Sequence, residues 1–162
     1  MTNWPQISIS ADQDYSHCFG CGQNNPIGLK LDFRRDGQTI RADFTPTGLH
    51  QGWPGMVHGG IIICLLDEAM GYACLFEDMI SVTAEIQVQL KRLTPINQPL
   101  LITSSVTRKT RKLVKTKARV TLKDGTLVAE GTATQFVVDS QGNKLIEEKL
   151  KEREDGKVSG SD

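Results

Sequence analysis

Alternating apolar and polar positions mark the first structured part of the chain. Leu29 to Arg34 and Thr39 to Phe44 each place an apolar residue at every second position, and Asp36-Gly37 lies between them. This period is typical of strands buried on one face, and Asp-Gly is a strong hairpin signal. The sequence therefore predicts an antiparallel pair of strands here.

A longer series of alternating segments occupies the second half of the chain. These segments span residues 82–93, 100–109, 113–123 and 127–138. Between the two series, residues 59 to about 76 are apolar at most positions, which predicts a helix buried on most of its circumference. The order of two strands, one helix and four strands predicts an α+β fold in which a single antiparallel sheet wraps around the helix.

The segments outside this pattern predict the domain limits. Residues 1–27 are rich in Gly, Pro and Asn, which predicts an irregular lead-in, and residues 140–162 are dense in charged residues. We expect one domain over 28–139, followed by a tail that is a frayed helix or disordered. The length of 162 residues fits a single domain.

Composition excludes several classes of partner. Lys plus Arg and Asp plus Glu balance at 19 each, so no strong field attracts nucleic acid or an anionic membrane. The longest apolar stretch, Ile61 to Leu66, is too short to span a bilayer, and the first residues lack the features of a signal peptide. We expect a cytoplasmic protein without nucleic-acid or membrane partners.

Two of the four cysteines, Cys18 and Cys21, form a Cys-x-x-Cys pair. A tetrahedral zinc site usually takes four ligands, and the chain has neither a second pair nor histidines at finger-like spacing. We therefore expect no metal site within one chain. The surrounding glycines are typical of a loop rather than of a redox motif at a helix start. The other two cysteines lie in the apolar helix and are expected to be buried.

The candidate chemistry lies at the start of the predicted helix, in His58-Gly59-Gly60. The first amides of a helix have no intrahelical partner and carry partial positive charge. Glycine lets a substrate approach them closely, so this turn is suited to an oxyanion hole. The alternative is that two glycines only ease a tight turn into the helix.

A carboxylate inside the apolar helix, Asp67, sharpens this interpretation. It follows Gly60 by seven residues, which places both on one side of the helix about 10 Å apart. Asp67 therefore cannot reach a carbonyl group bound at its own glycines, whereas two antiparallel helices across a two-fold axis would share two sites. The alternative is a structural carboxylate paired with hydroxyls or a cation. Glu68 points about 100° away and is expected to form a salt bridge or reach solvent.

The motif resembles that of the hotdog-fold acyl-CoA thioesterases, in particular the phenylacetic-acid-degradation branch and its mammalian relatives. It consists of His58-Gly59-Gly60, an apolar run and Asp67. Gly52-Trp-Pro-Gly-Met-Val and Cys18-Phe-Gly-Cys-Gly with Asn25-Pro-Ile-Gly-Leu are also similar to segments of many members. The resemblance extends from about residue 17 to 138, and the predicted order of strands and helix agrees with it.

The resemblance implies a role for each residue of the motif. The Gly59 amide would polarise the thioester carbonyl, with Gly60 beside it in contact with substrate. Asp67 of the partner subunit would be the nucleophile or the general base that activates water. Thr83 would position that water or the carboxylate, and His58 would lie near the thioester.

One position departs from the family pattern. Related enzymes often carry Asn or Gln six or seven residues before the glycine pair, where this chain has Gly52. Either Gln51 or His50 takes over substrate binding there, or the role is absent.

Thioester hydrolysis needs no cofactor, because a carboxylate and an oxyanion donor are sufficient. The basic cluster at Arg108, Lys109 and Arg111 is a candidate for contacts with the coenzyme A phosphates. Its alternative is a solvated hairpin, and Lys91 and Arg92 are competing candidates.

Three functions compete at this point. The first is a thioester hydrolase acting on acyl-CoA as a homodimer or a dimer of dimers. The second is a non-catalytic hotdog module that binds acyl-CoA and regulates a partner. The third, a hydratase or dehydratase, typically needs a histidine after the aspartate, and none follows Asp67.

Overall fold

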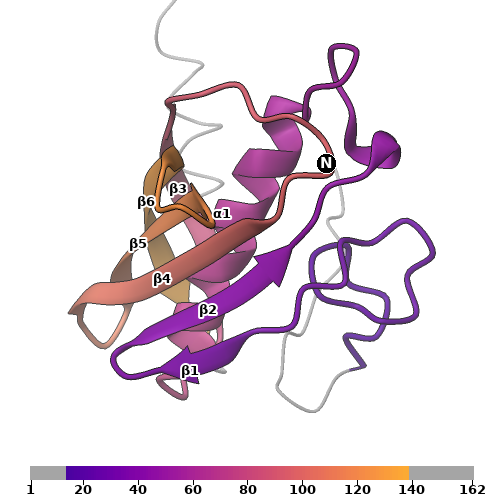
Figure 1. The fold of residues 1–162 in the computed structure, drawn as a ribbon. Coiled ribbons are helices and arrows are strands. Elements are labelled where there is room, and N and C mark those ends of the chain that lie inside the picture. The colour runs from indigo at the N-terminus through magenta and orange to yellow at the C-terminus, as the bar shows by residue number, and fades with distance from the viewer. Residues whose placement is uncertain (1–13, 139–162) are drawn as a thin grey trace, which may run out of the picture.

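The protein forms one antiparallel sheet and one long helix in a computed structural model that describes residues 14–138 (Figure 1). The strands are β1 (Arg34–Asp36), β2 (Thr39–Phe44), β3 (Ser81–Leu90), β4 (Leu100–Lys109), β5 (Leu113–Leu122) and β6 (Leu127–Val137). The helices are a short 3₁₀ turn, η1 (Gly48–His50), and α1 (Gly59–Leu75). The predicted α+β fold, a single sheet around one helix, is confirmed.

The sheet order is β1-β2-β4-β5-β6-β3, and every neighbouring pair is antiparallel. After α1 the chain enters β3, which pairs only with β6 and forms one edge of the sheet. This crossover places the strand that follows the helix beside the last strand rather than beside β2. The edge strand β3 is therefore the strand that leads directly away from the helix.

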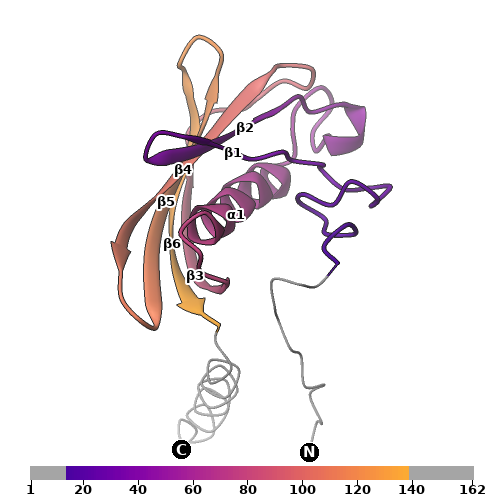
Figure 2. The same cartoon turned by 90° about the horizontal axis from the view of Figure 1, so that it is seen from below.

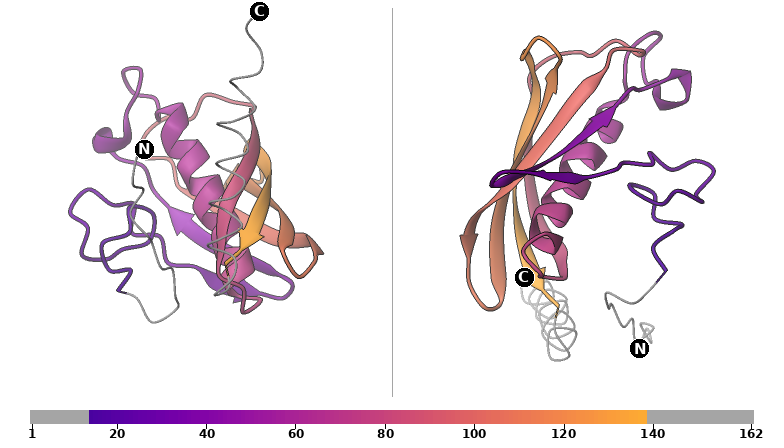
Figure 3. Two further views of the ribbon diagram at one scale, coloured as in Figure 1. Left: turned by 180° about the vertical axis from the view of Figure 1, so that it is seen from behind. Right: turned by 60° about the horizontal axis from the view of Figure 1, so that its bottom comes forward.

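The molecule has three layers. The sheet curves around α1, and the N-terminal segment lies on the other side of the helix (Figures 2 and 3). Residues of α1 fill the core between the layers, with Leu65, Leu66 and Met70 fully buried against the sheet. The helix is thus enclosed on most sides, which explains why its sequence is apolar at so many positions.

The helix begins and ends close to the predicted limits. His58 adopts an extended backbone as the N-cap, and Phe76 follows the last helical residue, Leu75. The exposed apolar positions, Ile63 and Leu75, are 37% and 46% accessible. Ile63 is four residues before Asp67, so an apolar patch and a carboxylate share one face of the helix.

The prediction of a strand over Leu29 to Arg34 is wrong for most of its length, although the predicted alternation of buried and exposed residues is correct. Leu29, Leu31 and Phe33 are buried, as the alternation requires, but only Arg34–Asp36 pairs with β2. Lys30 has a positive φ of 54°, which breaks an extended strand. The amides of Leu29 and Leu31 instead donate to the carbonyl groups of Phe19 and Gly20.

The longer strands lie within three residues of their predicted limits, and both Asp-Gly hairpins are present. Gly37 and Gly125 have positive φ values of 61° and 87°, which their turns require. The prediction for the charged tail from residue 140 lies outside the described residues, and the domain limits at 27 and 139 stay a prediction. Across residues 14–138, no helix has both the length and the apolar character needed to cross a membrane.

Candidate active site

The N-terminus of α1 is capped by the side chain of His58. Its Nδ1 accepts a hydrogen bond from the Gly60 amide at 2.9 Å. A neutral ring that accepts at Nδ1 carries its proton on Nε2, so His58 presents a donor on its other edge. The amides of Ile61 and Ile62 donate to the His58 carbonyl group. Of the first four amides of α1, only that of Gly59 donates no hydrogen bond within the described part of the chain.

The free Gly59 amide lies at a cavity of about 740 Å³. Gly59 and His58 form its floor with the end of β3 and the residues after it, among them Leu90, Lys91 and Arg92. A Cβ at position 59 would lie 3.1 Å from Leu90 Cδ1, so glycine is what allows this close approach. The cavity is therefore lined by the start of α1 and by two basic residues, of which Lys91 forms an ion pair with Glu130 at 3.3 Å.

Gly52, at the position that departs from the family pattern, lies against His58. A Cβ at position 52 would lie 3.1 Å from His58 Cα and 3.2 Å from Cδ2. The backbone and ring of His58 thus occupy the space that the first atom of a longer side chain would need.

Neither residue proposed to take over the role of this position is free. Gln51 Oε1 accepts from the Gly55 amide at 2.6 Å and holds the loop before the helix closed. His50 Nδ1 accepts from the Thr47 amide at 2.8 Å and completes the cap of η1. Burial lowers the pKa of His50, consistent with a neutral ring. Both side chains shape the loop, and neither lines the cavity.

Asp67 lies halfway along α1 and meets the edge strand. Thr83 Oγ1, on β3, donates a hydrogen bond of 2.7 Å to Asp67 Oδ1. The sequence separates these residues by 16 positions, and the turn from α1 into β3 brings them together. Oδ2 has no hydrogen bond in the described structure and is left for another partner.

Within one subunit, Asp67 and the Gly59 amide do not form one site. They are eight residues apart on a straight helix, a rise of about 12 Å. A carbonyl oxygen bound at Gly59 is therefore beyond the reach of the same chain's Asp67. In the structure Asp67 lies beside Thr83, and His58 lies beside the glycine pair. These two groups of residues are separate within one chain.

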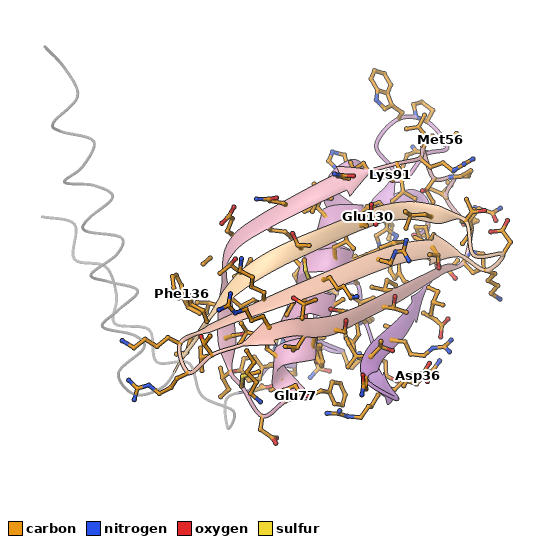
Figure 4. The ribbon with its side chains drawn as sticks, turned by 90° about the vertical axis from the view of Figure 1, so that its left-hand side faces the viewer. Asp36, Met56, Glu77, Lys91, Glu130 and Phe136 are labelled. Carbon is orange, nitrogen blue, oxygen red and sulfur yellow. The ribbon has the colours of Figure 1, made fainter. Side chains whose placement is uncertain are left out.

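The basic cluster at Arg108, Lys109 and Arg111 lies at the end of the molecule opposite this cavity. The β4–β5 hairpin that carries it pairs beside Phe136, and Lys109 Nζ lies 3.6 Å from Glu77 Oε2, just after α1 ends. Phe136 is at the opposite end of the molecule from Met56 and Lys91, as Figure 4 shows. The competing candidates Lys91 and Arg92 line the cavity instead.

The salt-bridge alternative for Glu68 is wrong within the described chain. Its side chain forms no ion pair with any basic residue of the described chain, and it is only partly exposed. It faces the N-terminal segment, where Cys18 Sγ lies 3.6 Å from its Oε1. The prediction failed because periodicity gives the direction of a helical side chain but not the segment that packs there. Gly20, next to the cysteine pair, was the available signal of a close approach.

Comparison with known proteins agrees with this architecture. A family model described as the thioesterase superfamily matches residues 54–129, which include the glycine pair, Asp67 and Thr83. The mouse acyl-coenzyme A thioesterase THEM4 is 30% identical over 96 residues, covering 58% of this chain and 41% of that protein. The chain thus matches less than half the length of this curated relative. The chain is similar to the thioesterase superfamily over residues 54–129.

Solved structures with the same fold include two bacterial proteins. The PaaI protein of the E. coli phenylacetic acid degradation operon superposes with a TM-score of 0.64 at 19% identity, covering 68% of this chain and 81% of that one. A hypothetical thioesterase from Streptococcus pneumoniae, solved with coenzyme A, gives 0.63 at 17%, covering 67% and 85%. At these identities the likeness is one of fold, and it confirms the hotdog architecture.

Proposed function

We propose that the protein is an acyl-CoA thioesterase that hydrolyses a thioester to a free acid and CoA. The observation that carries the proposal is the pair of half-sites on α1. One half is a free Gly59 amide in a cavity, and the other is Asp67 held by Thr83 at an open edge of the sheet. The match to the family model and the name of the mouse relative support the same chemistry.

The two halves become one site in a homodimer. The edge strand β3 is ten residues long, and a long unpaired edge is a ready template for another strand. Pairing β3 with its copy across a two-fold axis sets the two α1 helices antiparallel, with the exposed Ile63 and Asp67 faces turned toward each other. Asp67 of one subunit then approaches the Gly59 amide of the other.

In that site the chemistry needs only groups of the chain. The Gly59 amide donates to the thioester oxygen and stabilises the charge that develops on it during attack. Asp67 of the partner subunit either removes a proton from an attacking water or attacks the carbonyl carbon itself, and in the second route water then hydrolyses the acyl–Asp67 anhydride to the free acid and regenerates Asp67. Thr83 holds Asp67 Oδ1, which leaves Oδ2 to face the reacting carbon. The CoA thiolate leaves and takes a proton from solvent.

The cavity supplies a place for the coenzyme. Lys91 and Arg92 are the basic residues of its wall, and because Lys91 already pairs with Glu130, Arg92 is the candidate for contacts with the CoA phosphates. The Nε2 proton of His58 can donate to the thioester or to the pantetheine chain. Two structures related in fold were solved with coenzyme A or acetyl-CoA, which supports binding of this ligand class.

The spacing of Asp67 and Thr83 has a parallel in the S. pneumoniae protein. Two of its structures carry an alanine in place of an aspartate and of a threonine that are 16 residues apart, and Asp67 and Thr83 are also 16 residues apart. The match of spacing supports treating the two residues as a unit.

The test is release of free thiol from a panel of short-chain, long-chain and aryl acyl-CoAs, with the wild type and Asp67→Asn. We expect Asp67→Asn to lower kcat about 10²- to 10⁴-fold, because it removes the nucleophile or base but keeps the shape of the side chain. Asp36→Asn, in the exposed β1–β2 turn, is the matched control and should keep full activity. Wild-type turnover by Asp67→Asn, or full activity in a monomer, would contradict the shared site.

One further measurement separates the two roles of Asp67. A single turnover in heavy-oxygen water places the label in the product acid if Asp67 activates water. If Asp67 attacks the carbonyl and water then opens the anhydride at the Asp67 carboxyl carbon, the first product carries an unlabelled oxygen from the enzyme and the label remains in Asp67. If the panel binds but is never hydrolysed, the chain is the regulatory acyl-CoA-binding module considered from the sequence.

A further inference from the structure

Three metal-ligating side chains converge on the side of α1 away from the sheet. The Sγ atoms of Cys18 and Cys21 and a carboxylate oxygen of Glu68 all lie within 4.8 Å of one another. Cys18 Sγ lies 3.6 Å from Glu68 Oε1, although the two residues are 50 positions apart in the sequence. All three are partly buried. None of them belongs to the cavity at Gly59.

The N-terminal segment is shaped to make this approach. A Cβ at position 20 would lie 2.3 Å from Glu68 Cδ, so only glycine leaves room for the carboxylate between the two cysteines. A Cβ at position 22 would lie 2.4 Å from the Cys18 nitrogen, so only glycine fits in this tight backbone turn. The Gly22 amide donates to the Cys18 carbonyl group at 2.9 Å and stabilises the turn. The turn thus holds both sulfurs toward α1.

The surroundings of Glu68 lack a compensating cation. Over residues 14–138, no lysine, arginine or histidine lies within ion-pair distance of its carboxylate. Its neighbours are the thiols of Cys18, Cys21 and Cys64 and the hydroxyl of Tyr72, which donates to Cys21. A partly buried carboxylate among thiols is an arrangement that a bound cation would stabilise.

We propose that Cys18, Cys21 and Glu68 bind one zinc ion, with a water as the fourth ligand. This reverses the expectation from the sequence of no metal site within one chain, because the spacing of cysteines and histidines did not reveal Glu68 as a third ligand. Zinc prefers a tetrahedral set of thiolate, imidazole and carboxylate donors. With Zn–S near 2.3 Å and Zn–O near 2.1 Å, a sulfur and an oxygen ligand lie about 3.6 Å apart and two sulfurs about 3.8 Å apart. The Cys18–Glu68 pair already has this separation. On binding, each thiol releases one proton to solvent, and no electron is transferred.

The zinc would fasten the N-terminal segment to α1. Glu68 directly follows Asp67 but points about 100° away around the helix, so the metal lies on a different face from Thr83 and takes no part in hydrolysis. Because zinc binding to a site made of distant segments contributes to folding, the ion stabilises the docked segment. This role is independent of the proposed hydrolysis.

The test measures metal and not activity. Tag-free full-length protein is purified under reducing conditions, loaded with zinc, desalted and analysed by mass spectrometry for bound metal. We expect about one zinc per chain, and cobalt substituted for zinc should show thiolate charge-transfer and tetrahedral ligand-field bands. Cys18→Ser and Cys21→Ser should lose these bands, and Glu68→Gln should weaken zinc binding at least tenfold.

Matched controls make the result specific. Cys74→Ala removes a thiol from the same helix, and Glu77→Gln neutralises an exposed glutamate beyond its end, so both should bind zinc as the wild type does. Circular dichroism identifies variants that fail to fold, and the conservative Glu68→Gln keeps the test decisive if a cysteine variant does. Absence of stoichiometric zinc, a Cys18–Cys21 disulfide in its place, or a less than tenfold effect of Glu68→Gln would overturn the assignment.

Discussion

Asp67 and Glu68 are adjacent carboxylates on one helix, yet they lie in different chemical environments. Asp67 meets a hydroxyl on the edge strand, where Thr83 donates to it at 2.7 Å. Glu68 meets the thiols of an irregular segment, with Cys18 Sγ at 3.6 Å. A rotation of about 100° between successive helical positions separates the two.

The difference shows that the segment packed on each face of α1 decides what its carboxylates can do. An oxygen donor at an open edge leaves Asp67 oriented and accessible, which suits a nucleophile or base. On the enclosed side, Glu68 lies with the sulfur atoms of Cys18 and Cys21, and such a set of ligands suits a metal cation that binds thiolates. Changes on one face should therefore leave the property of the other face intact, and the following predictions test this separation.

The largest effect is expected from Thr83→Val, which removes the hydrogen bond to Asp67 and keeps the β-branched shape. A hydrogen bond to a charged group is worth about 1.5 to 3 kcal/mol, so kcat should fall about 10- to 100-fold. Because Thr83 positions Asp67 and does not bind CoA, KM should change little. Steady-state kinetics on the best substrate of the panel gives both constants.

Two comparisons make the Thr83 result specific. Thr83→Ser restores the hydroxyl and should recover most of the activity, whereas Thr132→Val on β6 is a control for loss of an exposed threonine. Zinc content should not change in Thr83→Val. A fall in kcat that Thr83→Ser fails to rescue would mean that the strand, and not the hydroxyl, is responsible.

A smaller effect, confined to the other face, is expected from Gly20→Ala. The added Cβ would overlap Glu68 Cδ at 2.3 Å, so the carboxylate has to leave the cysteine pair. Zinc affinity should fall about tenfold, which a competition titration with a coloured chelator measures, while kcat stays near the wild-type value. Gly48→Ala, where a Cβ meets no atom within 4 Å, is the control. Equal losses of zinc binding and kcat would show that the two faces are coupled.

The fold could be predicted from the sequence because its signals are local. Alternation in the four long strands and the apolar run of α1 reflect which face each element buries, and these elements lie close to their predicted limits. The short β1 could not be predicted, since Leu29 and Leu31 alternate in burial but bond to the backbone of a loop ten residues earlier. Alternation reports burial and not the pairing partner.

The candidate site was predictable only in part, for the same reason. A helix start with two glycines and a carboxylate two turns later can be found from spacing, and their roles stay a prediction. The His58 cap and the loop closed by Gln51 depend on the side-chain conformation adopted within two to four residues. The contact of Glu68 with the cysteine pair depends on a segment 50 residues earlier in the sequence. Periodicity carries no information on such contacts.

The smallest predicted effect concerns where the phosphates of the coenzyme bind. Arg92 lines the cavity beside the free Gly59 amide, whereas Arg111 lies on the hairpin at the other end of the subunit. Arg92→Ala should raise KM about threefold to tenfold and leave kcat unchanged, because an exposed cation contributes about 1 kcal/mol to phosphate binding. Added salt should reduce the difference from the wild type, since it screens this contact.

Lys123→Ala, in the β5–β6 turn, is the control for loss of one positive charge. If Arg111→Ala raises KM and Arg92→Ala does not, the phosphates bind at the hairpin of the partner subunit, and the cavity at Gly59 receives the acyl group instead.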